Sequence, residues 1–169
     1  MALKSPMIQP FNDQIQSEFT ASLQYVAIAA YFDDLSLVEL ANFFYRQAEE
    51  ERMHAMKFVH FMLETEVRPT IPAVPELRNA FDSPADAVDF ALQQERTVTE
   101  QIDNLVSLAL ENGDHAANNF LQWFVDEQVE EVDTMSTLLQ TVRLAGDNLL
   151  LVEDYVRRNP QHAGEDLSQ

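Results

Sequence analysis

The sequence contains no cysteine, and this absence excludes two kinds of site. Neither a disulfide framework nor a thiolate metal centre can form, so oxygen atoms and imidazoles must supply the ligands of any metal ion. Glycine is scarce as well, with 3 residues among 169. Long stretches without helix-breaking residues favour α-helices, and we therefore expect an all-α protein.

Basic residues are also few. The chain has 10 Lys and Arg residues but 29 Asp and Glu residues, which gives a formal net charge of −19. Because phosphate binding needs a basic surface, this balance argues against a nucleic-acid partner and favours cations. Acidity that serves only solubility would give the same charge, so the positions of the carboxylates have to distinguish the two explanations.

No apolar stretch is long enough to span a bilayer, and residues 1–10 lack the basic region and apolar run of a secretory signal. We therefore expect a cytoplasmic protein with no membrane partner. The length and the even composition fit one domain. We assign this domain to residues 1–160 and expect residues 161–169 to form a flexible, polar tail.

Apolar residues recur every three or four positions along four long segments, which predicts four amphipathic helices. The predicted helices cover residues 7–32, 36–64, 83–111 and 115–145, and a short amphipathic segment follows at 148–158. The second and third helices are separated by a long connection with prolines at positions 69, 72 and 75, and a fourth proline, Pro84, stands at the start of the third helix. These prolines rule out a continuous helix there. A long connection in the middle of a four-helix bundle predicts a crossover that leaves helices two and three parallel.

Each of the four long helices carries a glutamate within its apolar stripe, namely Glu18, Glu51, Glu95 and Glu131. A buried, unpaired carboxylate destabilises the folded state by several kcal/mol or must take up a proton. Four such groups at one depth of the bundle therefore require bound cations. A single such glutamate would more often be a surface residue. Its occurrence on all four helices favours a metal site instead.

Glu51 and His54 form a Glu-x-x-His pair, whose spacing places both side chains on one helical face, where they can bind a common ion. A lone histidine is more often a core residue, so this inference depends on the neighbouring glutamates. Oxygen ligands with one imidazole suit iron, manganese or zinc. Tyr25 lies two turns after Glu18 on the same face. Its phenol could donate a hydrogen bond or one electron to the site, and an ordinary core aromatic would have the same spacing.

Four stretches of the chain resemble the bacterial non-haem ferritins, a family of ferritin-like di-iron proteins. The stretches are residues 18–25, 49–54, 94–96 and 120–131, and the resemblance covers roughly residues 7–158. It implies a ferritin-like four-helix bundle with a long crossover between helices 2 and 3 and a short fifth C-terminal helix. It also implies an iron-storage ferritin that forms a homo-oligomeric shell of twenty-four subunits around hydrated ferric oxide.

The same resemblance implies a ferroxidase centre within each subunit, which oxidises Fe(II) to Fe(III) with dioxygen or hydrogen peroxide. Glu18, Glu51 and His54 would bind one iron ion, and Glu95 and Glu131 the second, with Glu51 bridging the two.

The resemblance extends to four further residues. Gln128 would lie beside the iron pair, and Glu50, Glu127 and Glu130 match a third, weaker iron site on the cavity side. Their helical phase leads us to expect that these three glutamates point toward the cavity and stay solvated, although as exposed charges they could equally be ordinary surface residues.

Bacterioferritins, which are related, carry a second Glu-x-x-His on the fourth helix and a haem-binding methionine directly after the bridging glutamate. In this chain Glu130 stands in place of that histidine and Arg52 in place of that methionine, with Met53 about a quarter turn away. We therefore expect no haem. The small DNA-protecting relatives lack a fifth helix and bind iron between subunits, whereas this chain has a complete ligand set of its own.

Two other functions remain open at this point. A di-iron or di-manganese oxygenase or electron-transfer bundle would share the carboxylate core but usually needs a second inward histidine. A structural helical assembly without metal would have apolar residues at the four glutamate positions.

Overall fold

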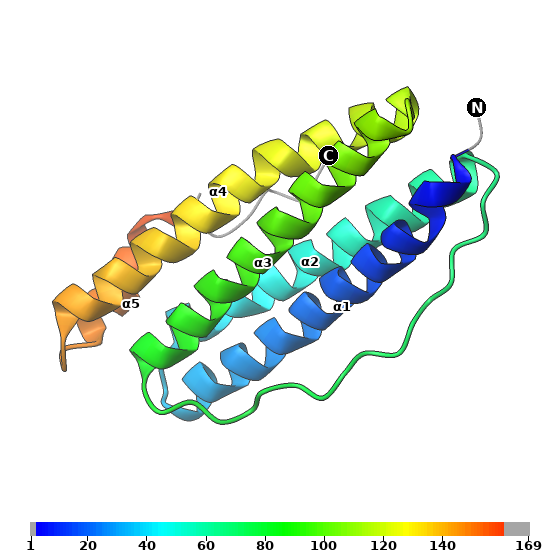
Figure 1. Cartoon of the computed structure of the whole chain (residues 1–169). Coiled ribbons are helices and arrows are strands. Elements are labelled where there is room, and N and C mark those ends of the chain that lie inside the picture. The colour runs from blue at the N-terminus through cyan, green and yellow to red at the C-terminus, as the bar shows by residue number, and fades with distance from the viewer. Residues whose placement is uncertain (1–2, 161–169) are drawn as a thin grey trace.

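The computed structural model describes residues 3–160, which form five α-helices and no β-strand (Figure 1). The helices are α1 (Ser5–Asp34), α2 (Val38–Glu64), α3 (Pro84–Glu111), α4 (His115–Ala145) and α5 (Leu150–Arg158). The first four form a bundle and α5 packs at one end of it, as predicted. None of these five helices is apolar and long enough for a membrane crossing. The tail expected at residues 161–169 lies outside the described part of the chain.

Local sequence signals determine where α3 and α4 begin and end. The Ser83 side chain accepts a hydrogen bond from the backbone N–H of Asp86 at 3.1 Å, which caps the start of α3. Asp114 caps α4 in the same way. The fourth helix ends at Gly146, whose φ of +57° is a conformation that glycine adopts without strain. The predicted starts of these helices are therefore confirmed by their capping contacts, and the predicted end of α4 is confirmed by the position of Gly146.

The connection between α2 and α3 runs beside α1 along the length of the bundle (Figure 1). Polar side chains of α1 hold its backbone through hydrogen bonds of 2.6–2.9 Å, which join Asn12 to Thr70, Gln16 to Ala73 and Gln24 to Arg78. These side chains satisfy backbone groups that a proline-rich segment leaves outside any helix. The crossover leaves α2 and α3 parallel, as the sequence predicted.

Two apolar clusters fill the bundle, one on each side of its middle. The first is built around Phe32 and Phe44, whose rings stack at 5.5 Å, and the second around Phe11, Phe58 and Phe124. Along each of the four long helices, the residues of one cluster end before those of the other begin. The four glutamates of the apolar stripes fall in this gap, so a polar layer lies between two apolar ones.

Helix α5 supplies the cap of α2. Its Val152 and Val156 are buried in the first cluster, and between them the Glu153 carboxylate accepts hydrogen bonds from the backbone N–H groups of Glu39 and Leu40, both at 2.9 Å. These donors belong to the first turn of α2, where a negative charge also interacts favourably with the helix dipole. The short fifth helix therefore stabilises the start of the helix that carries Glu-x-x-His.

The substitution Glu153→Ala removes both acceptors and leaves these N–H groups without their cap. We expect the free energy of unfolding to fall by about 1–2 kcal/mol, measured by urea unfolding with circular dichroism at constant protein concentration. Asp154→Ala is the control, because the Asp154 carboxylate pairs with Arg157 inside α5, at 2.6 Å. An equal loss of stability in the two variants would contradict the assigned cap.

Candidate metal centre

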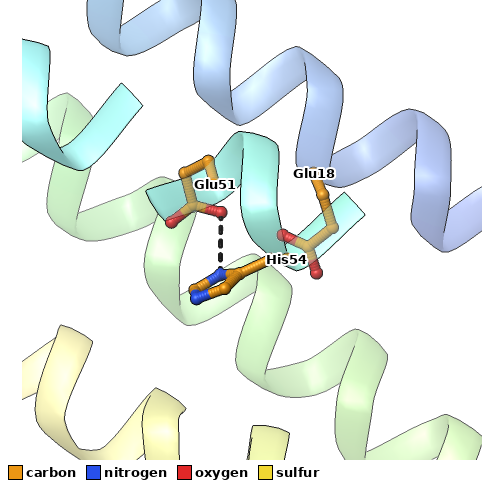
Figure 2. Close-up of side chains that lie close together, drawn as sticks. All are labelled: Glu18, Glu51 and His54. Atoms are coloured by element: carbon orange, nitrogen blue, oxygen red, sulfur yellow. Dashed lines mark ion pairs between the residues drawn. The ribbon is translucent and has the colours of Figure 1, made fainter. Parts of the chain in front are cut away.

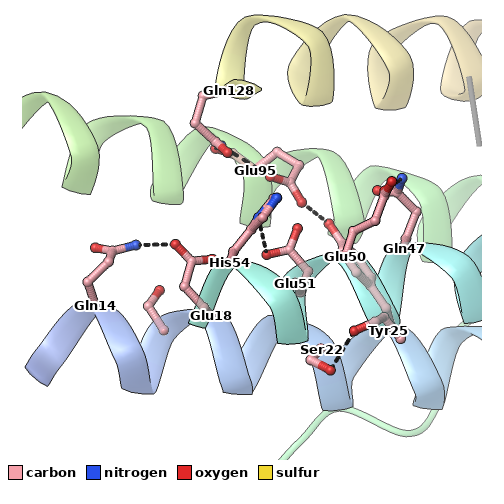
Figure 3. Close-up of polar contacts among 12 residues, drawn as sticks. Gln14, Glu18, Ser22, Tyr25, Gln47, Glu50, Glu51, His54, Glu95 and Gln128 are labelled. Atoms are coloured by element: carbon pink, nitrogen blue, oxygen red, sulfur yellow. Dashed lines mark hydrogen bonds and ion pairs between the residues drawn. The ribbon is translucent and has the colours of Figure 1, made fainter. Parts of the chain in front are cut away.

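The polar layer brings together side chains from all four long helices. Glu18 comes from α1, Glu51 and His54 from α2 and Glu95 from α3 (Figure 3). Glu131 comes from α4, and each of the five side chains is at most 4% exposed. The prediction that four glutamates converge inside the bundle is confirmed. The apolar clusters on both sides exclude water from this layer, so the charges of these groups are not screened as they would be on the surface.

The ligand atoms of these residues and of Glu127 form three overlapping groups. Within each group all atoms lie within 4.8 Å of one another. The groups are Glu18–Glu51–His54, Glu51–Glu95–Glu131 and His54–Glu127–Glu131. Glu51 is common to the first two groups, which is the arrangement that a carboxylate bridging two ions requires. The structure thus assembles both predicted ligand sets around one shared residue, while the binding of iron by them stays a prediction.

Polar contacts orient individual carboxylates within the layer. The Nδ1 atom of His54 lies 3.3 Å from Oε2 of Glu51 (Figure 2), and Nε2 of Gln14 donates to Oε1 of Glu18 at 2.8 Å (Figure 3). Gln14 is buried one turn before Glu18 and was not predicted from the sequence. Its spacing of four residues from an inward glutamate is the signal that could have identified it.

Tyr25 and Gln128 both contact Glu95. The buried Tyr25 hydroxyl donates a hydrogen bond to Oε1 of Glu95, whereas Nε2 of Gln128 donates to Oε2 of the same carboxylate at 3.2 Å. Gln128 therefore lies beside Glu95, while its position beside bound metal stays a prediction. Tyr25 is a hydrogen-bond donor to the site as well as a core aromatic, since its ring packs at 5.7 Å from Phe44. A one-electron role for Tyr25 stays a prediction.

Several buried oxygen atoms lack a protein donor. Among residues 3–160, Oε2 of Glu18, Oε1 of Glu51 and Oε2 of Glu131 find no hydrogen-bond partner. Buried polar atoms are normally satisfied, and those left alone in a native structure call for a ligand or water. Hard oxygen atoms from four helices, with one imidazole, are a ligand set that suits iron, manganese or zinc.

Burial and mutual repulsion act together on these carboxylates. Burial, followed by the charges of neighbouring glutamates, raises the pKa of Glu51 and that of Glu131 well above the ordinary value. Burial also raises the pKa of Glu95, against the hydrogen bonds from Tyr25 and Gln128, which lower it. The metal-free site therefore favours protons on some of its carboxylates, and a cation would displace them.

The three glutamates predicted for a third site differ in their surroundings. Glu130 is exposed and Glu127 is half-buried, close to His54 and Glu131. Glu50, in contrast, is only 7% exposed, so the expectation that it stays solvated is wrong. Gln47, one turn earlier on α2, donates a hydrogen bond from Nε2 to Oε2 of Glu50 at 2.6 Å, and this bond favours the inward position of the carboxylate.

Known proteins share both the sequence and this fold. Residues 8–145 match the family model described as ferritin-like domain. The chain is 52% identical over 155 residues to Ferritin BfrB of Mycolicibacterium smegmatis, covering 92% of this chain and 86% of that protein. It is 35% identical over 146 residues to the bacterial non-heme ferritin of Staphylococcus aureus (strain USA300), covering 86% and 88% of the two chains.

Among solved structures, the chain resembles an open-pore ferritin from the archaeon Archaeoglobus fulgidus, with a TM-score of 0.89 and 32% sequence identity over 98% of this chain and 100% of the other. Both sequence and structure therefore lead to one conclusion: the chain belongs to the ferritin family and carries a ferritin-like domain.

Proposed function

We propose that the chain is the ferroxidase subunit of an iron-storage ferritin, which oxidises Fe(II) inside its own helical bundle. One observation carries the proposal. Carboxylate oxygens from three helices are buried without a hydrogen-bond partner among residues 3–160, and they lie in groups that also include His54. A bundle selected for stability alone would not retain them, because each buried charge destabilises the metal-free fold.

In this function Fe(II) is a substrate, and the side chains place two ions next to each other. Glu18 and His54 complete one position, Glu95 and Glu131 complete the other, and Glu51 contributes to both. Negative oxygen ligands stabilise Fe(III) more than Fe(II), so they favour loss of one electron from each ion. Two Fe(II) ions supply the two electrons that, with two protons, reduce dioxygen to hydrogen peroxide, or hydrogen peroxide to two water molecules.

The storage part of the proposal concerns the assembly. Relatives named ferritin, together with the fold, support a closed shell of twenty-four subunits in the cytoplasm, in which Fe(III) leaves the bundle and collects as hydrated oxide. The strongly acidic chain suits a container for cations. We propose that no haem is bound, since Arg52 occupies the position that carries the haem methionine in bacterioferritins and Met53 lies on the exposed face of α2.

The number of buried histidines favours storage over an oxygenase. Within residues 3–160 only His54 is buried, whereas His60 and His115 are exposed. An oxygenase that activates dioxygen for an organic substrate usually has a second inward histidine. Mass photometry separates the two functions, because storage requires a very large closed shell and the oxygenase would be a monomer or dimer.

His54→Ala and Glu51→Ala each remove a ligand of the proposed iron pair. We expect the initial rate of Fe(II) oxidation, followed by stopped-flow absorbance, to fall at least about 100-fold, because loss of mere outer-shell partners already costs 10–100-fold. The shell should still assemble, since removing one ligand also relieves buried charge. His60→Ala is the matched control on the same helix and should oxidise iron at the wild-type rate. Normal rates in the ligand variants would place the chemistry elsewhere.

Glu51→Gln should stabilise the metal-free protein and destabilise the metal-bound one. Because the pKa of Glu51 is raised, its carboxyl group binds a proton more tightly in the native state than in the unfolded chain, where the pKa of Glu is about 4.3. Wild-type stability is therefore lost as pH rises above that value, and the variant lacks this loss.

Calorimetry of metal-free protein should show a higher melting temperature for Glu51→Gln than for wild type at about pH 8, with a smaller difference near pH 5. Saturating Zn²⁺ should reverse the order, because the variant loses the shared ligand. Glu100→Gln, at an exposed position of α3, is the control and should match wild type in both series. A metal-free variant that melts below wild type at both pH values would refute the electrostatic argument.

Glu130→Ala tests the passage of iron after oxidation. Glu130 is exposed and belongs to none of the ligand groups in the described part of the chain, so the first oxidation of two irons per subunit should be nearly unchanged. Repeated turnover should change, because iron leaves the filled pair more slowly. Oxygen consumption over successive iron additions separates the two phases, with Glu100→Ala as control. A loss in the very first addition would assign Glu130 to the primary site.

A further inference from the structure

We propose that Gln47 is a positioning residue that latches Glu50 next to the oxidation site, and that release of this latch assembles the neighbouring third site. The proposal rests on the proposed function, because it concerns the passage of iron away from the ligand pair. Gln47 belongs to none of the stretches that resemble known ferritins. Among the hydrogen bonds of residues 3–160, its side chain makes one, to Glu50.

The latch is a short hydrogen bond inside the bundle. Nε2 of Gln47 donates to Oε2 of Glu50 at 2.6 Å, and the two residues are one helical turn apart on α2 (Figure 3). Gln47 is 2% exposed and Glu50 is 7% exposed, so little water competes for this bond. A hydrogen bond to a charged acceptor in such surroundings is stronger than one between neutral groups.

The latched arrangement leaves the third site incomplete. Within residues 3–160, the ligand atoms of Glu127 lie within 4.8 Å of those of His54 and Glu131, whereas neither Glu50 nor Glu130 belongs to any such group. Glu130 is exposed on α4 while Glu50 is held inside. A metal site that uses both of these carboxylates therefore requires Glu50 to rotate outward.

Electrostatic repulsion drives Glu50 in that direction. Its charge is among the causes that raise the pKa of Glu51 and of Glu131, after burial and the closer carboxylates, so Glu50 is within electrostatic reach of both. The Gln47 amide opposes this repulsion by donating to the carboxylate. Loss of the donor shifts the rotamer equilibrium of Glu50 toward the exposed side, where water solvates the charge.

Replacement of Gln47 removes its hydrogen bond to Glu50 but leaves no polar atom of the new side chain unsatisfied when that side chain is apolar. Its Oε1 atom is buried and finds no hydrogen-bond donor in the described part of the chain. Gln47→Leu therefore removes an unsatisfied oxygen and introduces a side chain of similar volume. Gln47→Glu tests the latch in a second way, because it keeps the shape, removes the donor and adds a charge that repels Glu50.

The test uses Zn²⁺ as a redox-inactive probe on the assembled, metal-free protein. Calorimetric titration gives the number and affinity of ions bound per subunit, and anomalous diffraction at the zinc edge locates them in crystals. Wild type, Gln47→Leu, Gln47→Glu, Glu50→Gln and the double variant Gln47→Leu/Glu50→Gln are compared. Gln140→Leu, an exposed position on α4, is the matched control for the glutamine-to-leucine change.

We expect all six proteins to bind two Zn²⁺ ions at the pair. A third ion, near Glu127 and Glu130, should bind about tenfold more tightly in both single Gln47 variants, the effect of one lost charge-assisted hydrogen bond. This gain should disappear in the double variant and be absent from Gln140→Leu. In the iron reaction, Gln47→Leu should speed the recovery of oxidation between additions without changing the first addition.

Two failures are distinguishable. If wild type and variants bind two ions at the pair but third-site affinity in both Gln47 variants equals that of wild type, the latch is wrong and the proposed function stands. If wild type binds no ions at Glu18, Glu51 and His54, the proposed function itself fails. A gain that persists in the double variant would also overturn the latch, because it would not act through Glu50.

Discussion

The structure depends on one constraint, which is that buried carboxylates must be neutralised. Glu18, Glu51, Glu95 and Glu131 come from four helices into a layer that is closed on both sides by aromatic clusters. In water their charges would be screened, but inside the bundle they repel one another, and burial together with this repulsion raises the pKa of Glu51, Glu95 and Glu131. Protons or metal ions are the available solutions, and a metal ion would also satisfy the oxygen atoms that lack donors.

The surrounding protein then decides which oxygen atoms remain free for a cation. Gln14 occupies one oxygen of Glu18, and Tyr25 and Gln128 occupy the two oxygens of Glu95. Such partners hold the ligands in place before an ion arrives and reduce the reorganisation that binding requires. The same type of contact explains why Glu50 lies inside, although its helical phase differs from that of Glu51.

The scaffold places these groups at one depth by its topology. The crossover beside α1 leaves α2 and α3 parallel, and the stripe glutamates lie near the middle of all four long helices. Helix α5 adds the cap that Glu153 provides at the start of α2. Rigid helices, rather than loops, carry every proposed ligand of the pair, so the spacing between these side chains is set by helix packing.

The sequence alone determined the four long helices, the ends of α3 and α4, the crossover and the inward glutamates, whereas the predicted bounds 7–32, 36–64 and 148–158 differ by two residues from those of α1, α2 and α5. These features have a period of 3.6 residues or local capping chemistry, and both are readable along a single chain, as Ser83 and Gly146 show. The pairing of Glu51 with His54 was visible for the same reason, because residues three apart share a helical face.

Only the tertiary structure decided how the individual oxygen atoms are used. The Glu153 cap joins residues more than a hundred positions apart, and the contact of Tyr25 with Glu95 joins two helices, so no local pattern encodes either. The burial of Glu50 depends on the rotamer that Gln47 adopts in a crowded interior. Helical phase gives the direction of a side chain to within about one position, whereas hydrogen bonding and electrostatic repulsion between packed helices choose among its rotamers.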